Sequence, residues 1–142
     1  MAVTWNERLA IGEPEIDAQH RELFERVDAL LVAMRTGAGR ERLEEMFGFL
    51  QRYVLEHFQA EEALMRAEAY PHLAEHRDQH EAFIVRIVGI EEQLREHGPC
   101  SSYVMNASAL LCEWPREHVA DADRHFGQHL ALRRRRAESA PA

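Results

Sequence analysis

Four long stretches of the chain repeat apolar residues every three or four positions, and no other feature constrains the fold as strongly. This spacing matches one face of an α-helix, so each stretch is predicted to form an amphipathic helix. Glycine or proline interrupts the pattern near residues 37–39, 70–71 and 98–99. The predicted helices cover residues 17–35, about 40–66, about 72–96, and about 102 into an arginine run that begins at Arg133. Because the breaks are short, consecutive helices must turn back on each other, which predicts an all-α, antiparallel up-down-up-down four-helix bundle.

The two ends of the chain carry less regular patterns. Trp5, Gly12 and Pro14 lie in a predicted irregular N-terminal arm, and Asp17 is predicted to cap the first helix. A chain of 142 residues is expected to bury a single hydrophobic core, which predicts one bundle domain over residues 1–132. Residues 133–142 contain the arginine run and are expected to form a basic, flexible tail.

Charge and hydropathy exclude several classes of protein. Seventeen basic and 25 acidic residues give a net charge of -8, which disfavours nucleic-acid binding because phosphate contacts need a basic surface. No apolar run is long enough to span a bilayer and no export signal begins the chain, so a cytoplasmic protein without membrane contact is expected. Cys100 and Cys112 lack the spacing of a zinc or redox pair and are expected to be reduced. With no large apolar surface evident, a monomer is expected.

Several histidines and carboxylates occupy positions on the apolar stripes, where their side chains would face the core. His57 and Glu61 are four residues apart, and each such pair shares one helical face. Unpaired polar groups in an apolar core cost several kcal/mol each, so they need a compensating partner. The candidate set comprises His20, His57, Glu61, His76, His80, His118 and Asp123.

The heights of these residues along the bundle can be compared, because antiparallel neighbours place residues equidistant from their shared turn side by side. His20 lies about 18 residues before the first turn and His57 about 19 residues after it. Glu61 precedes the second turn by about 8 residues and His76 follows it by about 7. The remaining members, His80, His118 and Asp123, match across the third turn in the same way. All seven are therefore predicted to meet within about one to two helical turns of height.

A metal cluster would compensate this set best. Imidazole nitrogen and carboxylate oxygen together suit first-row ions such as iron. Seven ligands exceed what one tetrahedral zinc ion takes, but they fit two metal ions joined by two carboxylates. His118 and Asp123 are five residues apart, about 140° round an ideal helix, so they are predicted to point in different directions and to reach different atoms. The other histidines, which are expected at the surface or at turns, are His72, His97, His125 and His129.

These motifs resemble those of a bacterial hemerythrin, from about Trp5 to about Phe126. The matching pieces are Ile11-Gly12 and Ile16-Asp17 ahead of His20, the segment from His57 to Glu62, Tyr70-Pro71 ahead of His76 and His80, and then Trp114, His118 and Asp123. The resemblance implies two non-haem iron ions joined by a bridging hydroxide or oxo group. One iron would be held by His76, His80 and His118. The other would be held by His20 and His57, and both irons would share Glu61 and Asp123.

The same resemblance implies reversible dioxygen binding, for storage, delivery or sensing, with no catalytic residues. Dioxygen would occupy the vacant position of the two-histidine iron as hydroperoxide, while both irons become ferric and the bridging hydroxide supplies the proton. An apolar pocket around that position would keep water from displacing the bound oxygen. The residues expected to line it are Leu23, Phe24, Phe58, Trp114 and Pro115.

Pro115 departs from the bacterial hemerythrin pattern, which usually has a bulky aliphatic residue at this place. Proline cannot donate a backbone hydrogen bond to the carbonyl of Leu111, so a kink is expected there, one turn before His118. We hypothesise that Pro115 opens the pocket or a path to it. The opening would raise autoxidation or admit small molecules other than dioxygen.

Other functions could use the same centre. It could act as an enzyme, as a peroxidase, an oxidase or a nitric-oxide-handling site, because an open ferrous position is reactive. It could also sense oxidation state for another protein. A ferritin-like oxidase is disfavoured, because the Glu-x-x-His motif of those bundles is absent from the sequence.

Overall fold

The chain forms long helices joined by short turns. The structure is a computed structural model that describes residues 5–37, 39–97 and 101–139, and these ranges contain no strand. A short 3₁₀ helix, η1 (Glu7–Leu9), precedes α1 (Pro14–Arg35), α2 (Gly39–Ala67) and α3 (Leu73–His97). The last rod of the bundle is continuous and comprises α4 (Ser101–His118), a π-helical turn η2 (Val119–Asp123) and α5 (Arg124–Ser139).

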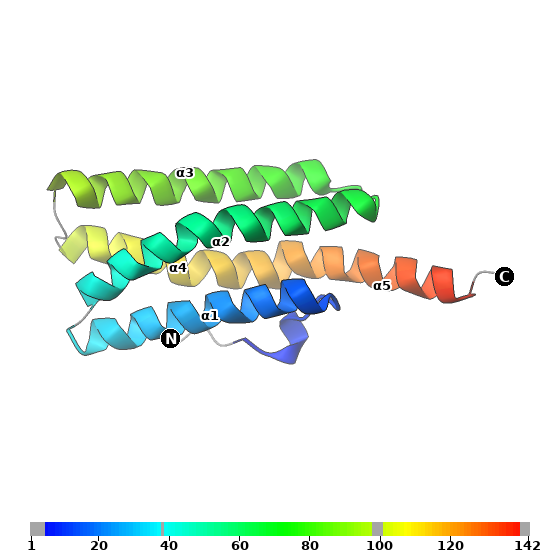
Figure 1. The fold of residues 1–142 in the computed structure, drawn as a ribbon, viewed down its shortest axis with the longest axis horizontal. Coiled ribbons are helices and arrows are strands. Elements are labelled where there is room, and N and C mark those ends of the chain that lie inside the picture. Colours follow the sequence, from blue (N-terminus) through cyan, green and yellow to red (C-terminus); the bar gives the residue numbers. More distant parts are fainter. Residues whose placement is uncertain (1–4, 38, 98–100, 140–142) are drawn as a thin grey trace.

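The four rods are arranged as the sequence predicts. Helix α1 packs against α2 and α4, and α3 packs against the same two helices from the opposite side. Figure 1 shows consecutive rods running in opposite directions, with α4 and α5 in one line. The prediction of an all-α, up-down-up-down four-helix bundle is therefore confirmed.

The start of α1 differs from the prediction. The helix begins at Pro14 with Glu13 at the N-cap, rather than after Asp17. Proline suits the first helical position because its ring sets the helical φ and its missing N–H is not needed there. Asp17 lies within the first turn, and its carboxylate accepts hydrogen bonds from the backbone N–H groups of Ile11 (2.8 Å) and Gly12 (3.2 Å). Asp17 therefore ties the N-terminal arm to the helix start.

The C-terminal end also differs from the prediction. Helix α5 continues to Ser139, so residue 132 does not mark a change in backbone structure. Two arginines of the basic run each pair with a carboxylate elsewhere in the fold. Arg133 Nε lies 3.0 Å from Glu68 Oε2, and an Arg134 nitrogen lies 2.8 Å from Glu13 Oε2. Residues 133–139 are therefore part of the last rod, and Arg134 contacts the N-terminal arm.

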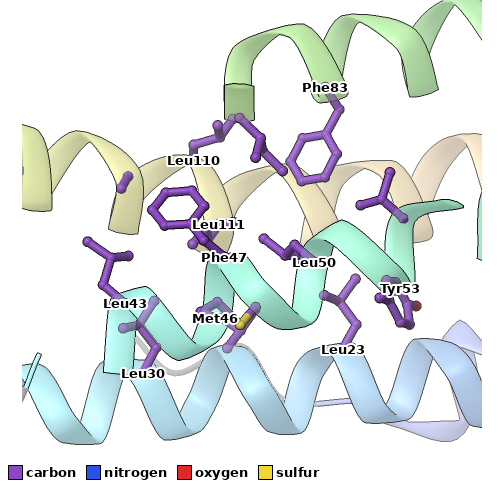
Figure 2. Packing of buried hydrophobic residues seen from close by; sticks show 14 of the residues in the cluster. Leu23, Leu30, Leu43, Met46, Phe47, Leu50, Tyr53, Phe83, Leu110 and Leu111 are labelled. Atoms are coloured by element: carbon purple, nitrogen blue, oxygen red, sulfur yellow. The ribbon is translucent and has the colours of Figure 1, made fainter. Parts of the chain in front are cut away.

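Buried apolar side chains form two clusters, one on each side of a band of polar residues. The larger cluster lies toward the α1–α2 and α3–α4 turns, and Figure 2 shows Leu23, Leu30 and Phe83 among its members. The smaller cluster lies toward the α2–α3 turn and contains Ile16, Met65, Tyr70, Phe126 and Leu130, together with Ile11 of the arm. The band between them contains every buried polar or charged residue that the structure describes.

Two further expectations concern membranes and thiols. No described helix is long and apolar enough to cross a membrane. Cys112 is a half-buried free thiol, and burial raises its pKa. Cys100 lies outside the described residues.

Candidate metal centre

The polar band contains all seven residues that the sequence places on apolar stripes. Helix α1 supplies His20, α2 supplies His57 and Glu61, and α3 supplies His76 and His80. The last rod supplies His118 at the end of α4 and Asp123 at the end of η2. Each of the seven is 5% exposed or less. The structure therefore brings together the whole predicted set, with a contribution from every rod of the bundle.

Three histidines lie near one oxygen of Glu61, and two of them also lie near one oxygen of Asp123. Glu61 Oε1 lies 2.5 Å from Nε2 of His76 and 3.2 Å from Nε2 of His80. Asp123 Oδ1 lies 3.0 Å from Nε2 of His76 and 3.2 Å from Nε2 of His118. One ligand atom from each of these five residues lies within 4.8 Å of all the others. This spacing is compact enough for a single ion to contact all five.

Two histidines gather round the opposite oxygens of the same carboxylates. Glu61 Oε2 lies 3.3 Å from Nε2 of His20 and 3.2 Å from Nε2 of His57. Asp123 Oδ2 lies 3.1 Å from Nε2 of His20. Each carboxylate thus points one oxygen at the three-histidine group and the other at the two-histidine group. A carboxylate in this position can bridge two ions.

The close contacts in the band fit metal ligands better than hydrogen-bonded pairs. The Nε2 atoms of His20 and His57 face each other at 3.1 Å, and those of His80 and His118 at 3.2 Å. Ligand atoms about 2.1 Å from a common ion and at right angles to each other are about 3.0 Å apart. Three buried oxygens, Glu61 Oε2 and both of Asp123, have no well-aligned hydrogen bond despite the imidazoles 3.0–3.3 Å away. The donor set therefore fits a pair of cations.

The electrostatics of the protein without metal show how strongly these groups interact. Burial lowers the pKa of His20, but the carboxylate of Asp123, and then that of Glu61, outweigh burial and raise this pKa to about 10. The same balance raises the pKa of His118 to about 9. For His57 burial dominates, and its pKa is lowered. Asp123 and Glu61 outweigh burial at His76 as well and raise its pKa, so the carboxylates favour the protonated imidazole at three of the five histidines.

The two carboxylates remain ionised in spite of burial. Burial raises the pKa of Glu61, but the neighbouring imidazoles of His118, His20 and His57 outweigh it and hold the pKa well below its usual range. The pKa of Asp123 is also lowered, because attraction to His118 and His20 exceeds burial and the repulsion from Glu61. Buried ionised carboxylates of this kind are found paired or bound to metals.

The π-helical turn η2 corrects one prediction about the centre. On an ideal α-helix His118 and Asp123 point in different directions, yet Asp123 Oδ1 lies only 3.2 Å from His118 Nε2. A π turn bonds residue i to residue i+5, so it places residues five apart almost one above the other. Because η2 spans Val119–Asp123, both side chains face the same site. Periodicity analysis assumed an ideal helix and could not detect the wider turn.

Three residues that the sequence analysis did not assign to the site contact the Nδ1 atoms of three of its histidines. Gln19 Oε1 lies 2.6 Å from Nδ1 of His57, and Gln79 Oε1 lies 3.0 Å from Nδ1 of His118. Glu62 Oε2 lies 2.8 Å from Nδ1 of His80. Gln-His dipeptides occur at 19–20, 79–80 and 128–129. In the first two, the glutamine contacts a histidine on the neighbouring helix.

The predicted pocket residues all lie on one side of the polar band. Leu23, Phe24 and Phe58 belong to the larger apolar cluster, and half-buried Trp114 packs against it. The Phe58 ring stacks on His80 at 3.7 Å, and the Trp114 ring stacks on His118 at 4.3 Å. Pro115 is buried, and α4 continues through it without a break. Phe58 and Trp114 thus contact the three-histidine group, while Leu23 and Phe24 follow His20 by one turn.

The remaining histidines lie outside the band. His72 and His125 are exposed, and His97 lies at the exposed end of α3. His129 Nε2 lies 2.8 Å from the backbone carbonyl oxygen of Glu68, to which it donates a hydrogen bond. None of these four contributes an atom to the groups of ligand atoms described above.

Comparison with known proteins identifies the family. The Hemerythrin HHE cation binding domain matches residues 12–130. Bacteriohemerythrin from Stenotrophomonas maltophilia is 29% identical over 90% of this chain and 81% of its own length. Bacteriohemerythrin from Pseudomonas aeruginosa is 33% identical over 85% of this chain and 76% of its own length. Bacteriohemerythrin from Clostridium acetobutylicum is 22% identical over 86% of this chain and 96% of its own length. With this match and a buried histidine–carboxylate centre inside it, the chain belongs to the hemerythrin family.

Proposed function

We propose that the protein binds dioxygen reversibly at a centre of two iron ions. One observation carries the proposal: Glu61 and Asp123 each direct one oxygen to a group of three histidines and the other to a group of two. This arrangement supports two adjacent metal positions that share both carboxylates. Membership of the hemerythrin family supports iron as the metal.

The proposed ligands follow from the two groups. His76, His80 and His118 would hold one iron, and His20 and His57 would hold the other. The groups differ by one histidine, so the second position has one protein ligand fewer and room for an external ligand. Dioxygen is proposed to bind at this two-histidine position. Two ferrous ions bound at these positions can supply two electrons to dioxygen and recover them when dioxygen is released.

The protein's own residues would make this chemistry reversible by excluding water. Leu23 and Phe24 lie one turn beyond His20 and are at most 4% exposed. Phe58 lies beside His57 in sequence and is also buried. Without apolar neighbours of this kind, water would compete for the two-histidine position and displace the bound oxygen. We propose that this apolar wall delays autoxidation.

Anaerobic loading with ferrous iron tests the proposal. We expect about two irons per chain, as in other di-iron bundles, and a visible charge-transfer band that appears with oxygen and fades when oxygen is removed. Fewer than two irons or an irreversible colour change would contradict oxygen carriage. Steady consumption of hydrogen peroxide would indicate an enzymatic function instead of oxygen carriage. Iron counts well above two per chain would indicate iron storage.

Matched histidine variants test the ligand assignment. His20→Ala removes one of the two histidines from the proposed oxygen-binding position, so we expect it to lower iron content and abolish the oxygen-dependent band. His125→Ala removes an exposed histidine outside the band and serves as the control. Equal losses in the two variants would show that iron binds elsewhere.

A further inference from the structure

The ring of His80 is held both at its edge and on its face. At the edge, Glu62 Oε2 lies 2.8 Å from Nδ1. On the face, the Phe58 ring is nearly parallel to the imidazole, with an interplanar angle of 3° and centroids 3.7 Å apart. The opposite nitrogen, Nε2, points into the polar band toward Glu61. These contacts leave the imidazole little freedom to turn.

Glu62 is itself held in place by a third residue. Arg77 Nε lies 3.2 Å from Glu62 Oε1, the oxygen that His80 does not use. The side chain of Glu62 is 21% exposed and that of Arg77 is 49% exposed. A continuous row of contacts therefore runs from the surface through Arg77 and Glu62 to His80 and the centre.

Glu62 is a charged hydrogen-bond acceptor, whereas the described acceptors at Nδ1 of the other histidines in the band are neutral. Among the described contacts to histidine Nδ1 atoms in the band, His57 and His118 use the neutral side-chain amides of Gln19 and Gln79. His80 uses a carboxylate. The buried Nδ1 of His20 has no hydrogen-bond partner in the part of the chain that the structure describes. The three-histidine group thus has two outer acceptors, one of them anionic, whereas the two-histidine group has one neutral acceptor.

A carboxylate acceptor changes what an imidazole can do for a metal. By accepting the Nδ1 proton it fixes the tautomer whose free electron pair lies on Nε2, and it raises the basicity of that nitrogen. A more basic ligand binds a metal ion more tightly and stabilises its higher charge. An amide oxygen fixes the same tautomer but adds no net charge. The identity of the acceptor can therefore tune the metal without changing its ligands.

We propose that Glu62 is a positioning residue that acts through His80 to strengthen the three-histidine metal position and to lower its reduction potential. The inference rests on the proposed di-iron centre. Glu62 does this by orienting the imidazole and by placing a negative charge beside it, and Arg77 keeps the carboxylate in place. The charge difference between Glu62 and the two glutamines makes the two metal positions electronically unequal.

Exchanging amide and carboxylate acceptors tests the role of Glu62. Glu62→Gln keeps the size of the side chain and an acceptor oxygen but removes the charge. We expect ferrous iron to bind about 10- to 100-fold more weakly to the three-histidine position and the reduction potential to rise. Gln79→Glu places a new carboxylate beside His118 on the same metal, so the potential is expected to fall. The potential would be measured by equilibration with redox mediators, which exchange one electron with each iron.

Controls separate this effect from misfolding and from failure of the centre itself. Circular dichroism of the metal-free variants should match that of the wild type. If wild-type protein binds two irons and Glu62→Gln has an unchanged potential and affinity, the role of Glu62 is refuted while the centre stands. If wild-type protein fails to bind two irons, the proposed centre is refuted as well.

Discussion

Glu61 has its two oxygens in separate surroundings, one beside three histidines and the other beside two. It is fully buried and yet ionised, because imidazoles from several helices surround it. In the protein without metal, His20 and His118 provide compensating positive charge by holding protons. A bound metal ion needs these imidazoles neutral, so metal and protons compete for the same nitrogens.

Proton release on metal binding follows from this competition. With pKa values of about 10 and about 9, His20 and His118 are protonated at pH 7 in the metal-free protein, whereas free histidine, at 6.5, is mostly neutral. Ferrous iron binding at pH 7 should therefore release protons, and apparent affinity should rise as pH increases toward 9. Anaerobic calorimetry in buffers of different ionisation enthalpy counts the protons. His118→Ala should release fewer, and an equal count in both proteins would refute the competition.

At the scale of elements, the last rod combines two departures from an ideal α-helix. Pro115 removes one backbone donor from α4, and η2 widens the helix immediately after His118. The wide turn brings Asp123 to the face of the rod that carries His118, which a regular helix would not do. The local helical irregularity is thus a requirement of the centre.

The effect of Pro115 can be measured directly. Pro115→Leu restores a backbone N–H for the Leu111 carbonyl and adds a bulky side chain one turn before His118. We expect slower autoxidation of the oxygen-bound protein, because the apolar wall would close. The visible band measures the rate after oxygenation, and Leu111→Val serves as a core control. An autoxidation rate equal to that of the wild type would dismiss the hypothesis.

The N-terminal arm depends on a glycine in α5. A Cβ atom at Gly127 would lie 3.1 Å from both Cα and Cβ of Ile11, so a large side chain there must displace the arm. We expect Gly127→Leu to lower the free energy of unfolding by about 1–3 kcal/mol through overpacking. Gly48 lies in α2 with open space around its Cβ position, so Gly48→Ala should raise the same free energy by about 0.5–1 kcal/mol. Urea unfolding compares the two, and a stabilised Gly127→Leu variant would show that the arm does not pack as described.

At the scale of the whole molecule, the polar band divides the core. Apolar clusters on either side pack the rods together, while the band places two buried carboxylates and five histidines at the centre of the bundle. Metal ions that bind all four rods would join the two halves of the core. The folded protein offers this set of ligands and the unfolded chain does not, so metal binding must favour folding.

Metal removal should therefore destabilise the entire bundle. At free metal about 1,000-fold above its Kd, binding contributes about 4 kcal/mol, which corresponds to about 10–15 °C in Tm for a chain of this size. Thermal unfolding under anaerobic conditions, with ferrous iron or with a chelator, measures the difference. His125→Ala should keep the full shift and His20→Ala should lose part of it. Identical Tm values with and without iron would contradict a centre that joins the rods.

The sequence by itself determined the helical architecture and which residues meet. Apolar periodicity and three short breaks specify four antiparallel rods, and equal distances from shared turns bring His20 level with His57 and Glu61 level with His76. These results depend only on regular helix geometry, which sequence spacing reports directly.

Tertiary structure alone decided the features that depend on departures from regularity or on contacts between helices. The π turn that aligns Asp123 with His118 leaves no periodic pattern in the sequence. Helix α1 begins at Pro14 rather than after Asp17, because a carboxylate near a helix start can cap either the helix or the preceding arm. Glu62 and Gln79 reach histidines on other helices, and side-chain rotamers set by packing decide such contacts. The spacing of residues along the chain specifies which helical face each side chain occupies and its height along the bundle. Hydrogen bonds between helices depend on how those helical faces pack against each other.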